Sequence, residues 1–304
     1  MTISSTFPGA HIDEAPHAAV SVPSAVVGFV GPAGHKASRY RSVSAALAIA
    51  PSVSVVIPTI NEAANLPHVF ATLPAWVEQV VLVDGHSTDD TVAVARELRP
   101  DIEVLTQRGA GKGDALLEGF LACSGEIIVT IDADGSTDGR EILQFVSALA
   151  AGADVAKGSR FLNGGRSDDI TFSRHCGNKL FSVLVNRIFG TRYTDLCYGY
   201  NAFWARHLGA MALDCAGFEV ETLISIRAAK AGLRVQEIPS YERPRLHGSS
   251  NLRAVRDGWR ILKVILSERV GGARRRGPSP PAPQPASPEP AMVVDADDAG
   301  RETP

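Results

Sequence analysis

The segment that most constrains the fold of this sequence runs from Glu126 to Asp138, EIIVTIDADGSTD. Residues 127–131 form a short, mostly β-branched apolar run of the kind that builds a strand buried on both faces. Asp132 and Asp134 stand where that strand should end. Ligands of open α/β sheets gather at the carboxyl ends of the strands. The segment therefore predicts a buried strand whose end carries functional carboxylates.

Two interpretations of the carboxylate pair remain open from these residues alone. Carboxylates one residue apart can hold a divalent cation, and the cation can hold a diphosphate. Alternatively, Asp132 and Asp134 only shape a turn, and Ser136, Thr137 or Asp138 caps the next helix. The D-x-D spacing by itself does not decide between a metal site and a turn.

The same strand-then-helix form recurs along the chain. Strands are expected at residues 52–58, 79–84, 102–106, 127–131, 154–157 and 233–239. Helices are expected at residues 65–73, 90–98, 114–122 and 141–151, in a stretch carrying Arg174, Asn178 and Lys179, and from about Phe218 onward. Residues 191–203 mix polar and aromatic side chains and are expected to form an irregular wall. This alternation predicts an α/β protein with a doubly wound, mostly parallel, Rossmann-like sheet.

Composition divides the 304 residues into a folded centre and two extensions. Residues 1–50 are rich in Ala, Ser, Val and Pro without a clear period, and residues 277–304 contain PSPPAPQP before an acidic end. Both extensions are predicted to be disordered or loosely attached. Between them we expect a single domain at residues 51–245, followed at residues 246–276 by a basic amphipathic helix and a basic cluster.

Charge and cysteine spacing exclude several classes of protein. A net charge of -3 argues against a general nucleic-acid binder. The four cysteines contain no C-x-x-C pair, which argues against zinc or redox chemistry and favours reduced thiols in a cytoplasm. We see no standard signal peptide, and prolines break the moderately apolar stretch 43–60, so we expect no transmembrane helix. The predicted location is cytoplasmic, at or near the inner face of the cell membrane.

A glycine-rich segment, GAGKG at residues 109–113, resembles a nucleotide-binding loop only superficially. Gly113 stands where a P-loop requires Ser or Thr, so a P-loop kinase is disfavoured. Lys112, at the start of a helix, is either a phosphate contact or an ordinary surface lysine.

The basic end of the domain suggests a second surface. Between Arg245 and Arg276 the chain holds nine lysines or arginines and only two acids. Within it, apolar residues recur at helical spacing at Leu252, Val255, Trp259, Leu262 and Leu266. Such a helix either lies in a membrane interface beside anionic lipid or packs on the domain as an ordinary helix.

Six motifs, taken in sequence order, resemble those of family 2 glycosyltransferases, and most closely the dolichol-phosphate (polyprenyl-phosphate) mannosyltransferase group. They are VIPTINE at 56–62, VDGHSTD at 83–89, GKGDAL at 111–116, DAD at 132–134, GSR at 158–160 and GFEVE at 217–221. The resemblance covers residues 52 to 245. The chain departs from the family pattern at Gly85 and His86, where Asp and Gly are frequent, and at Ile60, where an aromatic residue is common.

The resemblance implies a GT-A fold, a nucleotide-sugar donor, Mg²⁺ or Mn²⁺ at Asp132 and Asp134, and inversion at the anomeric carbon. It also implies a role for several further residues. Those expected in or near the nucleoside pocket are Pro58, Glu62, Asp84 and Asp114; Lys112, because of its place at a helix start, is expected among the donor-binding residues as a phosphate contact. Those expected near the acceptor phosphate are Arg160, Arg174 and Lys179.

The expected mechanism is transfer of a hexose from a donor of the GDP-mannose or UDP-glucose type to a polyprenyl or dolichyl phosphate. A phosphate acceptor is already ionised and needs no strong base, so Arg160 and Arg174 would hold it, unless each forms only a surface salt bridge. A hydroxyl acceptor would need a carboxylate base from Asp195, Glu219 or Glu221. The alternatives are thus the same chemistry on a soluble acceptor, or a catalytically silent nucleotide-sugar-binding relative.

Overall fold

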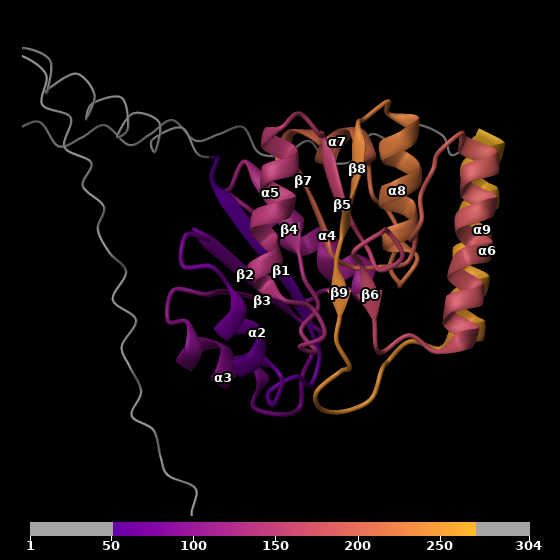
Figure 1. The fold of residues 1–304 in the computed structure, drawn as a ribbon. Helices are drawn as coiled ribbons and strands as arrows, with labels where there is room; N and C mark the ends of the chain where they lie inside the picture. The colour runs from indigo at the N-terminus through magenta and orange to yellow at the C-terminus, as the bar shows by residue number, and fades with distance from the viewer. Residues whose placement is uncertain (1–50, 272–304) are drawn as a thin grey trace, which may run out of the picture. The chain divides into compact units, whose positions relative to one another are not determined.

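The computed structural model describes residues 51–271 (Figure 1). The predicted extensions 1–50 and 277–304, and the basic cluster Arg274 to Arg276, lie outside the described residues. The domain boundaries at 245 and 246 remain predictions.

A seven-stranded sheet with the order β3-β2-β1-β4-β7-β5-β8 forms the centre of the described chain. Every neighbouring pair is parallel except the two that involve β7. The predicted mostly parallel sheet is therefore confirmed, and β8 is an edge strand, as expected. The strands are β1 (Val53–Thr59), β2 (Gln79–Asp84), β3 (Glu103–Thr106), β4 (Ile127–Thr130), β5 (Val155–Ser159), β7 (Asn201–Trp204) and β8 (Val235–Pro239). Two short strands, β6 (Arg166–Ser167) and β9 (Tyr241–Glu242), pair separately.

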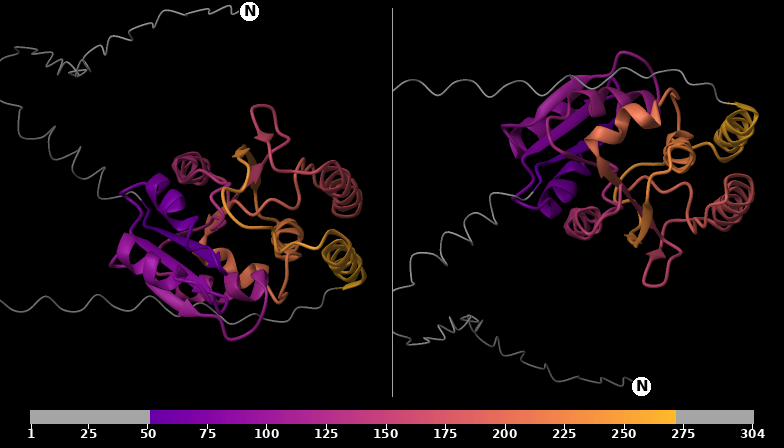
Figure 2. Two further views of the ribbon diagram at one scale, coloured as in Figure 1. Left: turned by 90° about the horizontal axis from the view of Figure 1, so that it is seen from below. Right: turned by 90° about the horizontal axis from the view of Figure 1, so that it is seen from above.

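Helices cover both faces of this sheet (Figures 1 and 2). Alternate side chains of β1 enter two different cores: Val55 and Ile57 lie with Phe145 of α5, whereas Val56 lies with Phe120 of α4. This alternation is why the strand is apolar throughout. The helices are α2 (Leu66–Thr72), α3 (Thr91–Leu98), α4 (Lys112–Ala122), α5 (Ile142–Ala150), α6 (Phe172–Phe189), α7 (Leu208–Met211), α8 (Val220–Lys230) and α9 (Ala254–Gly271).

The expectation of an irregular wall over residues 191–203 was wrong for its last part. Residues 191–200 are irregular, but Asn201–Trp204 forms β7, which runs antiparallel between β4 and β5. Residues 201–204 read Asn-Ala-Phe-Trp and contain no β-branched side chain, so the sequence shows no strand pattern there. The insertion of β7 brings the preceding irregular segment, including Gly199, to the carboxyl end of β4.

Close packing of α4 on the sheet gives a testable difference between two helical glycines. A Cβ on Gly119 of α4 would lie 2.4 Å from Val56 Cγ1, whereas a Cβ on Gly177 of α6 would meet nothing within 4 Å. We expect Gly119→Ala to lower the free energy of unfolding by about 1–3 kcal/mol through overpacking. Gly177→Ala should raise it by about 0.5–1 kcal/mol through helix propensity. Urea unfolding of both variants checks this, and an unchanged stability of Gly119→Ala would contradict it.

Candidate active site

A pocket of about 750 Å³ opens at the carboxyl ends of β1, β2 and β4. This volume is typical of small-molecule sites. The ends of β1 and β4, the first turns of α4, α6 and α8, and residues 245–256 line it together. The residues predicted from the sequence that line it are Pro58, Glu62, Lys112, Asp132, Asp134, Arg160, Arg174 and Glu221.

Asp84 and Asp114 lie behind the pocket wall. The Asp84 carboxylate, at the end of β2, accepts a hydrogen bond from the backbone N–H of Ser87. Asp114 accepts one from Nε2 of Gln107, at 3.1 Å. Gln107 itself lines the pocket and is 5% exposed. Sequence reasoning missed it because a glutamine after a strand gives no motif. Asp84 and Asp114 therefore stabilise the lining of the pocket indirectly, through Ser87 and Gln107.

The carboxylate pair serves a turn and still presents oxygens to the pocket. Asp134 Oδ1 accepts a hydrogen bond from the backbone N–H of Ser136, at 3.0 Å, which closes the turn after β4. Asp138 caps the short helix Gly139–Glu141 by accepting from the N–H of Arg140. The aspartates therefore do shape a turn, and Asp138 does cap the next helix, as the second interpretation expected. The side chains of Asp132 and Asp134 nevertheless remain 29% and 22% exposed, facing the pocket.

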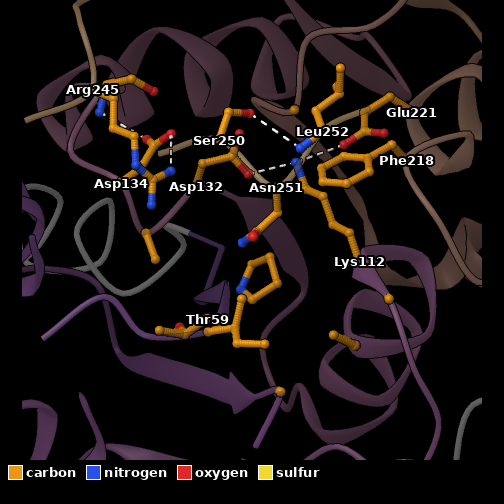
Figure 3. Close-up of a pocket in the computed structure, with 18 of the residues that line it drawn as sticks. Thr59, Lys112, Asp132, Asp134, Phe218, Glu221, Arg245, Ser250, Asn251 and Leu252 are labelled. Atoms are coloured by element: carbon orange, nitrogen blue, oxygen red, sulfur yellow. Dashed lines mark hydrogen bonds and ion pairs between the residues drawn. The ribbon is translucent and has the colours of Figure 1, made fainter. Parts of the chain in front are cut away.

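Lys112 is not a surface lysine. Its side chain is 13% exposed, and Nζ lies 2.6 Å from Asp132 and 2.8 Å from Glu221 (Figure 3). Burial opposes its charge, but the two carboxylates more than compensate and hold the pKa of Lys112 above its ordinary value. A Cβ on Gly199 would lie 2.6 Å from Nζ, so this position admits only glycine without displacing the lysine.

Arg245 is a pocket residue that the sequence analysis counted in the basic end without a role. Its Nη1 lies 3.3 Å from Asp134, and its Nη2 pairs with Glu62. Its Nε donates to the backbone carbonyl of His247, at 2.8 Å. Burial raises the pKa of Glu62, and hydrogen bonds from Asn65 and Arg245 partly offset that rise. The segment after β9 thus reaches back across the pocket to β1 and β4.

Arg160 is the centre of a buried ion network. It is 5% exposed and binds Asp195 through Nε at 2.7 Å and Nη2 at 3.0 Å. Its Nη1 binds Glu242 at 3.0 Å. The surface salt-bridge interpretation is therefore wrong for Arg160. Arg174 instead forms a partly exposed pair with Asp169, at 3.4 Å. Contact of either arginine with an acceptor remains a prediction.

The three carboxylates considered as a base for a hydroxyl acceptor differ in their surroundings. Asp195 is fully buried; burial would raise its pKa, but the guanidinium of Arg160 outweighs this and lowers it. Glu219 accepts from the N–H of Gly217, at 3.1 Å. Glu221 lines the pocket, and burial raises its pKa while Lys112 partly offsets the rise. Of the three, only Glu221 lines the pocket.

The donor set of the aspartate pair fits a metal shared with a substrate. No cluster of three or more His, Cys, Asp or Glu side chains that could hold a metal occurs in the described part of the chain. Mg²⁺ is commonly bound by one or two carboxylates together with substrate phosphates and water. Asp132 and Asp134 meet that requirement if a diphosphate supplies the remaining oxygens.

Comparison with known proteins gives consistent matches. The sequence model described as glycosyl transferase family 2 matches residues 54–212. Glycosyltransferase AglJ of Haloferax volcanii is 31% identical over 69% of this chain and 70% of its own length. Polyprenol monophosphomannose synthase of Mycolicibacterium smegmatis is 33% identical over 61% and 75%.

A solved structure shares the fold. Glucosyl-3-phosphoglycerate synthase from Mycobacterium tuberculosis, crystallised with Mn²⁺, UDP and glucosyl-3-phosphoglycerate, superposes with a TM-score of 0.59. It is 21% identical, and the match covers 81% of this chain and 88% of that one. The GT-A fold is thereby confirmed, and the chain belongs to glycosyl transferase family 2.

Proposed function

We propose that this protein is a metal-dependent, inverting hexosyltransferase that moves a hexose from a nucleotide sugar to a polyprenyl phosphate. One observation carries the proposal. The pocket extends from the aspartate pair to the first turns of α6 and α9, where Arg174 and Arg256 line it together with Leu252, which lies just before α9. An anionic head group with an apolar tail fits cationic and apolar side chains placed together in this way.

On the donor side, the chain supplies positive charge beside the aspartate pair. Lys112 and Arg245 contact Asp132 and Asp134 and line the pocket, so both would be available to pair with a donor diphosphate bound there. When bound, a divalent cation supplies Lewis-acid stabilisation of the charge that develops on the leaving diphosphate. Pro58 and Gln107 line the far end of the pocket, which we assign to the nucleoside.

On the acceptor side, Arg174 is the better placed of the two predicted arginines. Among residues 51–271 its guanidinium pairs only with Asp169, which is partly exposed, so donors remain for a phosphate. An oxygen of the ionised phosphate attacks the anomeric carbon while the bond from that carbon to the donor diphosphate breaks, and the nucleoside diphosphate leaves; the attacking oxygen carries no proton, so no general base is needed. Arg160 is held by Asp195 and Glu242. In this proposal it fixes the part of the pocket lining beside α6, the helix that carries Arg174.

We further propose that α6 and α9 hold the protein against an anionic membrane. The two helices pack side by side (Figures 1 and 2), with Phe181 of α6 against Gly258 of α9. α9 packs on the domain through Ile261 and Ile265. Apolar side chains on both helices nevertheless face solvent: Phe172, Leu180, Val183, Val255, Trp259, Leu266 and Val270.

Basic side chains accompany these exposed apolar residues. Lys179 and Arg187 are exposed on α6, and Arg256, Arg260 and Lys263 are exposed on α9. Apolar groups among cations match a lipid interface with anionic head groups. Between residues 51 and 271, no helix is long and apolar enough to cross a bilayer.

This surface gives a prediction for membrane binding. Val183 is 59% exposed and Val255 is 89% exposed, and the double variant Val183→Glu, Val255→Glu places an acid at each position. We expect it to lose at least about tenfold in affinity for vesicles of phosphatidylglycerol and phosphatidylcholine. Leu143→Glu, at a 58% exposed position on α5, is the matched control and should bind as the wild type does. Sedimentation with the vesicles measures both, and equal binding by all three proteins would contradict the proposal.

A soluble acceptor is the second candidate. It is favoured by the solved structure of similar fold, which was crystallised with glucosyl-3-phosphoglycerate. A transfer assay that offers polyprenyl phosphate and 3-phosphoglycerate together, with labelled UDP-glucose or GDP-mannose, separates the two. Label in the organic phase supports the lipid acceptor. Label only in the aqueous phosphoglycerate fraction replaces it with the soluble one.

A further inference from the structure

Lys112 joins one member of the aspartate pair to a glutamate from another element. Its Nζ contacts Asp132 and Glu221 at nearly equal distances, 2.6 and 2.8 Å. The two carboxylates differ in exposure: the side chain of Glu221 is 3% exposed and that of Asp132 is 29% exposed. A hydrated ion entering the pocket therefore reaches Asp132 far more easily than Glu221.

Arg245 repeats this arrangement on the other aspartate. It contacts Asp134, whose side chain is 22% exposed, and Glu62, whose side chain is 6% exposed. Figure 3 shows Arg245 and Lys112 approaching the aspartate pair from different sides. Each cation thus has one accessible partner and one buried partner.

The balance of charge indicates what happens when substrates enter. Four carboxylates face two cations, and the surplus negative charge favours a divalent cation. If Asp132 and Asp134 held a metal, Lys112 and Arg245 would each lose one carboxylate partner. The buried glutamates stay with the cations, and the oxygens of a diphosphate can then replace the lost partners.

We propose that Glu62 and Glu221 are positioning residues that keep Arg245 and Lys112 tethered while both cations pass from the aspartates to the donor diphosphate. This inference rests on the proposed function, since it presumes a metal and a nucleoside diphosphate donor. It assigns Glu221 an electrostatic task in place of the general base that a hydroxyl acceptor would require. It also makes binding of the metal and the diphosphate mutually dependent through the two cations.

A double-mutant cycle on the full chain tests the tether. We expect Glu221→Gln to weaken binding of UDP or GDP in the presence of Mn²⁺ by about fivefold or more when Lys112 is present. In the Lys112→Met background the same change should cost less than about twofold, because the residue it positions is gone. Isothermal titration calorimetry measures both, and the better-bound nucleotide is used throughout.

Metal binding without a nucleotide provides a second readout. Lys112→Met removes the competitor of Mn²⁺ for Asp132, so Mn²⁺ alone should bind at least as tightly as it does to the wild type. A merely structural role for Lys112 would weaken Mn²⁺ and nucleotide binding together. Circular dichroism confirms that each variant folds.

The pair Glu62→Gln and Arg245→Met forms an independent cycle with the same expected result. Arg99→Met and Asp101→Asn, which break an ion pair outside the pocket, form the control and should leave nucleotide affinity unchanged. Equal losses from Glu221→Gln with and without Lys112, or no nucleotide binding by the wild type, would overturn the inference. Because no acceptor is present, failure of transfer to a lipid phosphate leaves this result unaffected.

Discussion

Replacing Asp134 with alanine is expected to lower the rate of hexose transfer by about 10²–10³-fold or more. The carboxylate faces the pocket beside Arg245, and its loss would remove one of the two metal ligands that we propose. The fold should survive, because the side chain is 22% exposed and its turn can close through water. The measurement is the initial rate of lipid-linked product formation with saturating donor and Mn²⁺.

The matched control for this variant is Asp101→Ala. Asp101 pairs with Arg99 outside the pocket, and its side chain is 68% exposed. Its replacement should leave the rate within about twofold of the wild type, as for most surface changes. Full activity of Asp134→Ala would contradict the assignment of the pair. No activity in the wild type with any donor would favour the catalytically silent alternative.

Replacing Arg160 with methionine is expected to reduce the free energy of unfolding by about 3–5 kcal/mol. The change leaves Asp195, which is fully buried, and Glu242, which is 7% exposed, without their shared cation. An unpaired buried carboxylate is far more costly than a lost surface ion pair. Urea unfolding at neutral pH measures the effect.

Arg166→Met is the control for this loss of stability. Arg166 is 69% exposed and pairs with Asp168, so its loss should cost less than about 1 kcal/mol. If Arg160→Met were as stable as Arg166→Met but bound the acceptor poorly, Arg160 would be a phosphate ligand and not a structural cation. If it is unstable as expected, the acceptor contact falls mainly to Arg174.

Most of the fold and one edge of the site could be predicted from the strands and the residues at which they end. Six strands, five of them together with the helix that follows, could be predicted because apolar runs alternate with turn and capping residues. The same runs end on Pro58, Asp84 and Asp132, so the edge of the sheet that holds the pocket was also predictable. The antiparallel strand β7 was not, because pairing in the middle of a sheet depends on neighbours distant in sequence.

The ion pairs within the pocket cannot be predicted from sequence patterns. Asp132 and Lys112 are 20 residues apart, and Arg245 is 111 residues from Asp134, so only the folded chain shows that they meet. The direction that α9 faces could not be predicted from the sequence either. The apolar spacing predicted an amphipathic helix, but the packing residues are Ile261 and Ile265, while Val255, Trp259 and Leu266 face solvent.

Transfer of a hexose to polyprenyl phosphate is tested most directly by measuring formation of a lipid-linked sugar by the purified full chain. The protein is incubated with labelled GDP-mannose or UDP-glucose, polyprenyl phosphate and Mn²⁺, and the label is extracted into organic solvent. We expect extractable product from at least one donor, and we expect it to be lost on addition of EDTA and restored by excess Mn²⁺. Absence of lipid-linked product with every donor, or full product formation in EDTA, would contradict it.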